Sequence, residues 1–396
     1  RDVPDYGECG RDVPLTEREI GEEWCYDAPT RDLNPLRNEP SPGCEQVSFC
    51  SCMVEMHDGY DVWGEEVAYV GPNAAAVMGS LLIDTRTWTE YVIEPWDPDG
   101  GPEQPWPYVP KISSPGGVFD AQRMARLTTG SYVVYWNRET GRKRMLHADG
   151  AAGPSGGQRG VYRVDDLFRS VALVERHETS GPDTNLRTID VETTDNLALT
   201  DYPGGDIIWE AQMWEDLVVF SGGWGIDLVS LTDRTPTRLA PYPTAQWDPA
   251  IHDRRVCWMD LRYGGGDPGA YHEREEVFCA EIDSGEAWNA SQEPDYQKRA
   301  PTVFGDWVAW AQRRVREGET TGAPPWTDVA LYHRRLDRRW KLMERAPGFL
   351  SFAGGLDTPR LWEPYVYFLG ARGEGASRSM EIYRCHLPTL FPEAYE

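Results

Sequence analysis

The chain has 396 residues, enough for two or three ordinary domains or for one large repeat architecture. Its 65 acidic and 39 basic residues give a net charge of −26, which disfavours nucleic-acid binding and attachment to an anionic membrane, because both need a basic surface. Seventeen Trp and 19 Tyr, with 39 Gly and 31 Pro, are typical of short aromatic strands joined by tight turns rather than of long helices.

The first 44 residues are rich in Pro, Asp, Glu and Arg, and Arg-Asp-Val-Pro occurs at both 1–4 and 11–14. This composition predicts an irregular extension pinned by disulfides, with a partner-docking arm as the alternative. Because the chain begins with Arg1 rather than Met, we expect a mature form whose signal peptide has been removed. No stretch approaches 18 uninterrupted apolar residues, so we expect no membrane span.

The eight cysteines form an even set without CxxC metal pairs or a CxxCH haem motif. Five of them lie in the first 52 residues, which favours disulfides in an oxidising compartment over zinc ligands, with free buried cysteines as the alternative. We therefore expect a secreted, periplasmic or cell-surface protein. The eight positions are Cys9, Cys25, Cys44, Cys50, Cys52, Cys257, Cys279 and Cys385.

A unit of four predicted strands repeats along most of the chain. Its clearest copies begin near Trp247, Arg299 and Asp357, each with a Pro-containing strand, a tight polar turn and an alternating Val/Trp/Tyr strand. Weaker copies begin near residues 61, 111, 162 and 209. A four-stranded antiparallel unit cannot bury both faces alone, so the units are expected to stack around an axis. The sequence predicts an all-β fold, a seven-bladed β-propeller of four-stranded antiparallel blades over residues 45–396, with tandem β-sandwiches as the alternative.

The repeated phrases have a known counterpart. The segment Trp247-Asp-Pro-Ala-Ile-His-Asp-Arg-Arg-Val-Cys-Trp-Met-Asp-Leu-Arg262 and the segment Arg299-Ala-Pro-Thr-Val-Phe-Gly-Asp-Trp-Val-Ala-Trp310 resemble the TolB-like β-propeller repeats of bacterial periplasmic and cell-surface proteins. The resemblance extends over about residues 58 to 390. It implies the fold more firmly than a function, because propellers serve enzymes, lectins and scaffolds alike.

The last repeat lacks a fourth strand after Met380–His386. Because an incomplete blade leaves an open edge, we expect a strand at about 46–55 to complete it. That strand would bring Cys50 or Cys52 beside Cys385, and strand alternation allows only one of the two to face it. Cys257 and Cys279, on consecutive antiparallel strands, are expected to pair, and the remaining four N-terminal cysteines would pair among themselves.

Motifs for common enzymes are missing: the sequence has no Gly-x-Ser-x-Gly elbow, no Walker loop and no His-Glu-x-x-His. Its seven histidines are scattered, so a metal site at the propeller axis is an open alternative. The segment 97–100 matches part of a calcium loop but lacks the later ligands of an EF-hand. We expect no cofactor, with Ca²⁺ compatible with the acidic charge.

Candidate binding residues lie at two kinds of position. Trp247, Asp248, Arg299 and Asp357 stand at the starts of first strands, which should line the funnel of a propeller. Long loops at 94–110, 263–275 and 315–327 carry further aromatics, including Trp106 and Trp326. Such loops commonly mark a recognition surface for sugars or proteins, although the rings could instead pack over blade edges. Within the repeat, Asp260 and Arg262 are expected to form an inter-strand ion pair.

These observations favour a noncatalytic binding or scaffold protein that engages a protein partner or a cell-surface assembly through its long-loop face. A carbohydrate-binding propeller is the first alternative. A lyase or hydrolase with its site in the central funnel is the second.

Overall fold

The structure is a computed structural model of the whole chain. The residues that it describes are 12–14, 16–19, 43–47, 60–72, 78–87, 89–95, 105–107, 111–113, 116–125, 128–137, 142–148, 160–178, 184–200, 208–223, 225–239, 245–262, 275–314, 328–345, 356–372 and 379–396.

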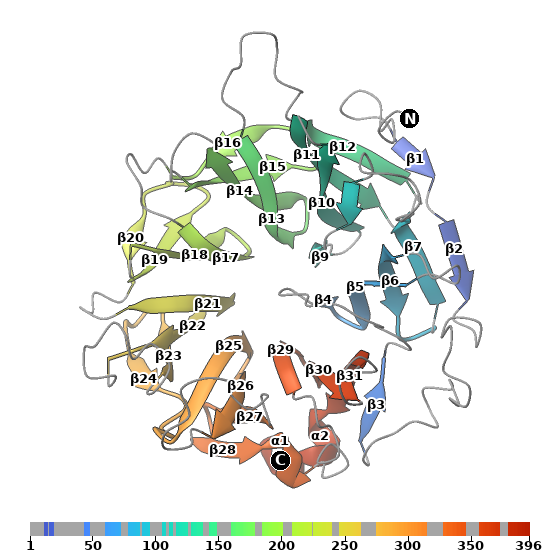
Figure 1. Cartoon of the computed structure of the whole chain (residues 1–396). Coiled ribbons are helices and arrows are strands. Elements are labelled where there is room, and N and C mark those ends of the chain that lie inside the picture. The colour runs from blue at the N-terminus through green and yellow to red at the C-terminus, as the bar shows by residue number, and fades with distance from the viewer. Residues whose placement is uncertain are drawn as a thin grey trace. The chain divides into compact units, whose positions relative to one another are not determined.

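Two compact units divide the chain. The first comprises Arg1–Asp27, Asp58–Asp216 and Val229–Pro236, and the second comprises Ala28–His57, Leu217–Leu228 and Thr237–Glu396. Each unit is built from antiparallel sheets, which we call blades (Figure 1). The strand that opens each repeat is called its inner strand.

The first unit contains three complete blades. One has the order β2(Thr16–Glu19), β7(Thr89–Pro95), β6(Met78–Asp84), β5(Glu66–Pro72), β4(Tyr60–Trp63). The next has the order β1(Asp12–Pro14), β12(Arg142–Ala148), β11(Thr128–Asn137), β10(Gly116–Ala125), β8(Pro105–Pro107), and β9(Lys111–Ser113) also pairs with β10. The third has the order β13(Gly160–Phe168), β14(Val171–Glu178), β15(Thr184–Asp190), β16(Asn196–Ala198).

The second unit also contains three complete blades. They are β21(Gln246–His252), β22(Arg255–Asp260), β23(Glu276–Glu281), β24(Ala287–Asn289); β25(Tyr296–Phe304), β26(Trp307–Arg314), β27(Asp328–His333), β28(Arg338–Lys341); and β29(Leu356–Trp362), β30(Tyr365–Arg372), β31(Ser379–His386), β3(Cys44–Gln46). Two short helices, α1(Leu342–Arg345) and α2(Leu387–Leu390), and a 3₁₀ turn at Pro392–Ala394 follow β28 and β31.

The prediction of seven equal blades is wrong. Six blades, not seven, are complete within a unit, and two of these six carry more than four strands. The repeat at 208–238 forms the strands β17(Ile208–Trp214), β18(Leu217–Gly222), β19(Gly225–Ser230) and β20(Thr237–Arg238), which pair in that order but belong to neither unit as a whole. Its inner strand β17 packs against β13 in the first unit, whereas β18 packs against β21 in the second.

The N-terminal segment differs from the predicted irregular extension. Two of its stretches are strands that lengthen blades of the first unit: Asp12 of β1 pairs with Arg144 of β12, and Thr16 of β2 pairs with Val92 of β7. The edge strands of two blades therefore gain partners from a segment whose polar composition gives no strand signal. Residues 1–11 and 20–42 lie outside the described part of the chain.

The last blade is completed by an N-terminal strand, but not by the predicted one. The strand is β3, at 44–46 rather than 46–55, and Cys44 lies opposite Cys385 of β31. These two cysteines form a disulfide over a sequence separation of 341, so the partner of Cys385 is Cys44 and not Cys50 or Cys52. The signal at 46–55 is the more hydrophobic one, which is why the sequence places the strand too late. Cys9, Cys25, Cys50 and Cys52 lie outside the described residues.

Further contacts hold β3 in place. The backbone N–H of Val47 donates to the carbonyl of Ile382 over 2.7 Å, that of His386 donates to the carbonyl of Gly43 over 2.8 Å, and Arg384 pairs with Glu45. Gly43 has a φ of +83°, and a Cβ there would lie 2.9 Å from Thr389 Cγ2, so this position needs glycine. The disulfide therefore joins two strands, β3 and β31, that are also held together by hydrogen bonds.

The cores lie between successive blades. In the second unit, Val303, Val308 and Trp310 of one blade form a cluster with Cys257 and Met259 of the blade before it. The alternating Val/Trp pattern that predicts these strands is therefore the pattern that fills the space between blades. In the parts of the chain that the structure describes, no helix has the length and apolar character needed to cross a membrane.

Candidate functional site

Three of the predicted binding residues lie together in the second unit. Trp247 and Asp248 belong to β21, and Arg299 belongs to β25 of the next blade. A carboxylate oxygen of Asp248, Oδ2, accepts a hydrogen bond of 3.2 Å from the backbone N–H of Ala300. Trp247 is partly buried and packs against the core between the two blades. The pairs Trp247-Asp248 and Arg299-Ala300 are therefore neighbours.

The structure does not describe the side chains of the other predicted binding residues. Asp357 lies on β29 and Trp106 on β8, but the side chains of both are outside the described atoms. Trp326 lies outside the described residues. The binding role of these positions stays a prediction.

A bulge shapes each of the two inner strands. The register shifts between Trp247 and Ala250 in β21 and between Arg299 and Thr302 in β25. The residues before the prolines in these bulges, Asp248 and Ala300, have φ values of 50° and 49°. Non-glycine residues rarely adopt this left-handed region, and bulges often re-aim side chains next to functional sites. The Pro-containing phrase of the repeat therefore marks a bulge within the strand.

The Asp248 contact recurs in the first unit. Asp61 Oδ2 accepts from the N–H of Ile112 over 2.8 Å, and Asp166 Oδ2 accepts from the N–H of Met213 over 2.7 Å. In each case an inner-strand aspartate bonds to the inner strand of the following repeat, 47 to 52 residues later. We call this contact the inter-blade latch. Asp248 thus has a structural role.

Lys298, the residue before Arg299 on β25, is held by several hydrogen bonds. Its side chain is fully buried, and its ammonium donates to the carbonyls of Glu275 over 3.0 Å, Tyr296 over 2.8 Å and Glu293. It also lies 3.5 Å from Glu276 Oε1. Burial lowers the pKa of Lys298, and the negative charge of Glu276 opposes that shift. Sequence reasoning missed this residue, because a lysine on an inner strand normally predicts an exposed position.

Glu275 and Arg299 both have shifted pKa values. Glu275 is 5% exposed, and burial raises its pKa to about 8; the charge of Asp248 adds to the shift, while Lys298 and Arg313 oppose it. Arg299 is partly buried. Burial and the positive charge of Arg313 lower its pKa to about 10, against the opposing effect of Asp248. The two residues share two charged neighbours, Asp248 and Arg313, and such shifted pKa values occur in functional sites as well as in structural ion-pair networks.

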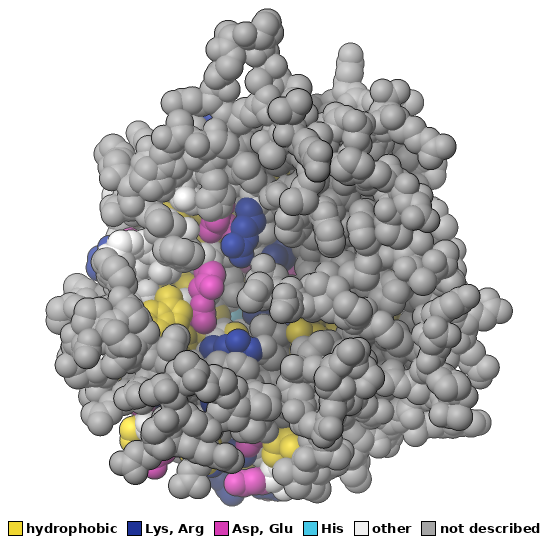
Figure 2. All heavy atoms as spheres, in the orientation of Figure 1, with side chains coloured by type: hydrophobic (Ala, Val, Ile, Leu, Met, Phe, Trp, Pro, Cys, Tyr) yellow, Lys and Arg dark blue, Asp and Glu magenta, His cyan; other side chains and the backbone are white. Residues whose placement is uncertain are grey.

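We call this group the inner-strand charge cluster: Asp248, Glu275, Glu276, Lys298, Arg299 and Arg313. Its members are three cations and three carboxyl groups, and the carboxylate of Glu293 also acts on Lys298. The whole chain carries −26. Figure 2 shows acidic and basic side chains close together, with hydrophobic side chains beside them, on the face in view. The cluster gathers three cations of an acidic protein, and two of them, Arg299 and Arg313, are partly exposed.

A buried acidic pair also occurs in the first unit. Asp165, on β13, is 7% exposed, and burial and the charge of Glu175 on β14 raise its pKa well above the usual range. Burial and the charge of Asp61 raise the pKa of the latch residue Asp166 to about 7. The strand β13 has a register shift between Val164 and Asp166, and at this shift Asp165 is buried and Asp166 is partly buried.

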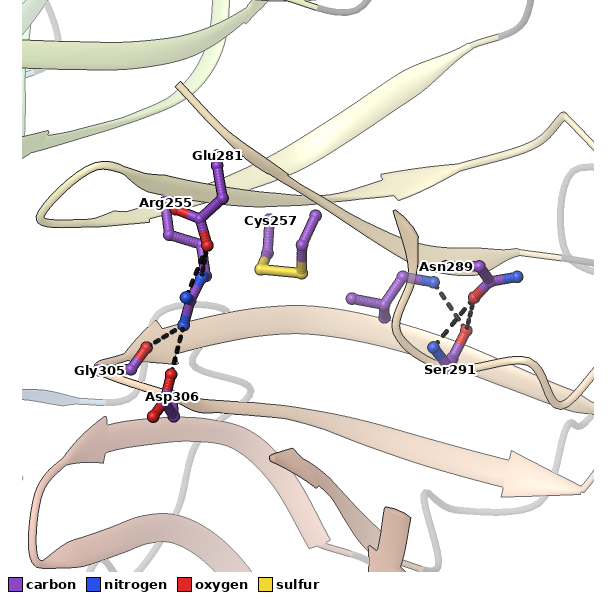
Figure 3. Close-up of a disulfide and its surroundings, with 9 residues drawn as sticks. Arg255, Cys257, Glu281, Asn289, Ser291, Gly305 and Asp306 are labelled. Atoms are coloured by element: carbon purple, nitrogen blue, oxygen red, sulfur yellow. Dashed lines mark hydrogen bonds and ion pairs between the residues drawn. A yellow bond between two sulfur atoms is a disulfide. The ribbon is translucent and has the colours of Figure 1, made fainter. Parts of the chain in front are cut away.

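The predicted Cys257–Cys279 disulfide is confirmed, between directly paired residues of β22 and β23 (Figure 3). Beside it, Arg255 pairs with Glu281 over 2.6 Å and reaches Asp306 of the next blade over 3.6 Å. The two disulfides of the described residues are consistent with a secreted or extracellular protein.

The expected pair of Asp260 and Arg262 is present, with 2.7 Å between Asp260 Oδ2 and Arg262 Nη2, but both residues lie on one segment and not on two strands. The fully buried Asp260 also accepts from Gln246 Nε2 over 2.8 Å and from Trp258 Nε1 over 3.0 Å. Asp84 and Arg86 repeat the 2.7 Å pair in the first unit. This pair is a structural element of the repeat.

The described side chains offer no group of three or more His, Cys, Asp and Glu residues that could hold a metal ion. His252 and His333 are the last residues of β21 and β27, and burial lowers the pKa of both, to about 4 for His252. No contact among the described residues joins either histidine to the charge cluster.

Comparison with known proteins identifies the fold. No family model matches the chain, so the resemblance to TolB-like repeats stays a prediction. No curated protein matches it either.

Among solved structures, the propeller domain of the Trilobed protease from Pyrococcus furiosus is 11% identical, with a TM-score of 0.53 over 83% of this chain and 93% of that one. An oligogalacturonate lyase in complex with manganese is 9% identical, with a TM-score of 0.51 over 98% and 100% of the two chains. Puromycin hydrolase is 11% identical, with a TM-score of 0.57 over 87% of this chain and 54% of that one. At such identities the likeness concerns the fold alone. The chain is therefore an all-β protein with the β-propeller fold.

Proposed function

We propose that the chain binds a carboxylate-bearing oligosaccharide at the inner strands β21 and β25. The guanidinium of Arg299 contacts a sugar carboxylate, and the ring of Trp247 faces the sugar. The observation that carries the proposal is the position of Trp247 and Arg299, which are both partly exposed on the neighbouring strands β21 and β25. In a chain of net charge −26, a partly exposed guanidinium is a place that can attract an anion that the acidic surface repels.

The residue types suit this ligand. A guanidinium presents a planar fork of donors that matches a carboxylate, and a partly buried one forms stronger hydrogen bonds than it would in water. A tryptophan offers a flat apolar face with a polar edge, which suits a sugar ring. Trp247 and Arg299 are both partly exposed on neighbouring strands.

The choice of an acidic sugar also has support from one compared protein. The oligogalacturonate lyase, whose name gives a polymer with one carboxylate per sugar, corresponds to this chain over nearly the full length of both. The three compared proteins are a protease domain, a lyase and a hydrolase. The protein-partner scaffold role expected from the sequence therefore gains no support from them, and neither does a specifically periplasmic or cell-surface location.

A lyase is the second candidate, and the shifted pKa values favour it. Elimination beside a sugar carboxylate needs a base for the proton next to the carboxylate and an acid for the departing oxygen. The buried carboxyl of Glu275, whose pKa burial raises to about 8, is the candidate acid, and we assign no base. The manganese of the compared lyase has no matching ligand group among the described residues, so no step is assigned to a metal.

Calorimetric titration with a galacturonate trimer tests the binding proposal. Arg299→Ala should weaken binding about tenfold or more, since a hydrogen bond to a charged group contributes about 1.5 to 3 kcal/mol. The control is Arg254→Ala, because Arg254 lies at the exposed turn between β21 and β22, where its side chain pairs with Asp283. Equal binding of a neutral trimer, or no loss in the Arg299 variant, would contradict the proposal. Ultraviolet absorbance of an unsaturated product separates a lyase from a binding protein.

A further inference from the structure

The Cys44–Cys385 disulfide lies inside an apolar cluster of the second unit. Both cysteines are at most 1% exposed. The cluster draws on the blade that begins with β25, on the blade that begins with β29 and on the residues after β31; its members include Leu331, Trp340, Val366, Tyr383, Leu390 and Phe391. A thiol therefore reaches these sulfur atoms only when a neighbouring segment moves away.

The residues 387–396, which we call the C-terminal clasp, comprise α2 and the 3₁₀ turn and follow β31 directly (Figure 1). They contact the edge strands of both blades. Glu393 pairs with Arg338 of the edge strand β28. On the other blade, a Cβ on Gly43, which precedes the edge strand β3, would lie 2.9 Å from Thr389 Cγ2. The clasp therefore reaches the residue next to Cys44 while it is attached to the opposite blade.

Phe391 is the apolar anchor of the clasp. Its ring is fully buried, and its centroid lies 5.3 Å from that of Trp340 and 5.7 Å from that of Trp307. The ring of Tyr395 stacks on Trp307 with 6.3 Å between centroids. Trp307 belongs to β26 and Trp340 to β28, so these rings attach the clasp to two strands of the preceding blade.

Three arginines of that blade hold the polar side of the clasp. Glu393 Oε1 lies 2.8 Å from Arg345 Nη2 and 3.7 Å from Arg338 Nη1. Arg335 Nη2 donates to the carbonyl of Ala394 over 3.1 Å. All three arginines are exposed, so each of these contacts contributes little by itself. A short segment held by one buried ring and by weak polar contacts can open locally while the blades stay folded.

We propose that the C-terminal clasp controls the access of thiols to the Cys44–Cys385 disulfide: the bond is protected while the clasp is seated and becomes reducible when the clasp opens. With a dithiol as reductant, one thiolate attacks a sulfur of the disulfide, forms a mixed disulfide and releases the other cysteine, which takes a proton from water. The second thiol of the reductant, as its thiolate, then displaces the remaining cysteine, which is also protonated, and the reductant leaves as a cyclic disulfide. The products are two cysteine thiols, and β3 loses its covalent link to the blade that it completes. This inference does not depend on the proposed function.

The test is reduction of the folded chain by dithiothreitol, followed by alkylation and peptide mass spectrometry, which report each disulfide separately. Phe391→Ala should speed reduction of Cys44–Cys385 by at least about tenfold, because loss of the buried ring favours the open clasp. Glu393→Gln weakens two exposed ion pairs and should speed it about two- to fivefold. The matched control Glu396→Gln changes an exposed carboxylate of the same segment and should keep the wild-type rate.

The second disulfide serves as an internal reference. Cys257 and Cys279 are fully buried in another blade, so their bond should be reduced at the wild-type rate in every variant. Wild-type rates at Cys44–Cys385 in both clasp variants would overturn the proposal. Equal acceleration of both disulfides would also overturn it, because reduction would then require unfolding of the blades and not opening of the clasp. If Phe391→Ala does not fold, Glu393→Gln decides between these results, since its side chain is partly exposed.

Discussion

Asp248 and Ala300 lie on successive inner strands, and the carboxylate of the first accepts the backbone N–H of the second over 3.2 Å. Both residues have a left-handed φ, and a proline follows each. The same aspartate-to-backbone bond joins Asp61 to Ile112 and Asp166 to Met213. The inter-blade latch therefore ties the position of Arg299, the neighbour of Ala300, to the preceding blade.

Removal of this latch should destabilise the second unit. Asp248→Ala leaves the N–H of Ala300 without its acceptor and should cost about 1 to 2 kcal/mol of unfolding free energy. Asp248→Asn keeps an oxygen acceptor and tolerates a positive φ, so it should recover most of that loss. Urea denaturation of the two variants checks this. Equal stability of the Ala and Asn variants would show that the hydrogen bond does not contribute.

Lys298 should be more important for stability than any exposed lysine. Lys298→Met leaves the buried Glu276 without its cation and should destabilise the protein by about 3 kcal/mol or more. Lys341→Met is the control, since Lys341 is partly exposed and its pair with Glu293 should contribute less than about 1 kcal/mol. Thermal unfolding of both variants measures the difference. Similar melting temperatures would contradict the buried role of Lys298.

Stability should depend on pH with a maximum near pH 5. Burial raises the pKa of Glu275 to about 8 and the pKa values of Asp166 and Asp328 to about 7. The folded state holds these protons more tightly than the unfolded state, so their contribution is full below pH 4 and is lost as the pH rises toward 8. Hydrogen bonds from Arg86 and Arg262 lower the pKa values of Asp84 and Asp260 against burial, and their contribution is lost as the pH falls below about 4.

Urea denaturation from pH 4 to pH 9 tests this profile. The free energy of unfolding should decrease above pH 5, and Glu275→Gln should remove part of the decrease between pH 6 and pH 8. A rise in stability from pH 5 to pH 8 would show that these carboxyls are ionised in the folded state.

The two disulfides should differ in their effect on stability. In the chain-entropy model, the 22-residue separation of Cys257 and Cys279 corresponds to about 3 kcal/mol, and the 341-residue separation of Cys44 and Cys385 to about 5 to 6 kcal/mol. The double variant Cys44→Ser/Cys385→Ser should therefore unfold at a lower temperature than Cys257→Ser/Cys279→Ser. Peptide mapping by mass spectrometry should find the Cys44–Cys385 link. A link from Cys50 or Cys52 to Cys385 would contradict the position of β3.

Sequence patterns predict the parts of this fold that depend on local periodicity. The repeats that begin near Trp247, Arg299 and Asp357 become complete blades, and Cys257 and Cys279 pair because they lie on adjacent strands. The blade count fails at 208–238, where β17 and β18 pack against different units. Strand periodicity carries no information about which neighbour a strand contacts.

Only part of the candidate site can be predicted from the sequence. Trp247, Asp248 and Arg299 follow from their place in the repeat. Lys298 and Glu275 do not, because their burial depends on contacts between residues 23 positions apart on different blades. A charged residue on a strand or just before one normally indicates solvent exposure, and here the packing between blades overrides that signal.

The most direct test of the central claim is a crystal structure of the chain with a bound galacturonate trimer. The proposal predicts a sugar carboxylate within hydrogen-bond distance of the Arg299 guanidinium and a sugar ring against Trp247. A trimer bound away from β21 and β25, or an empty site at a saturating trimer concentration, would contradict it.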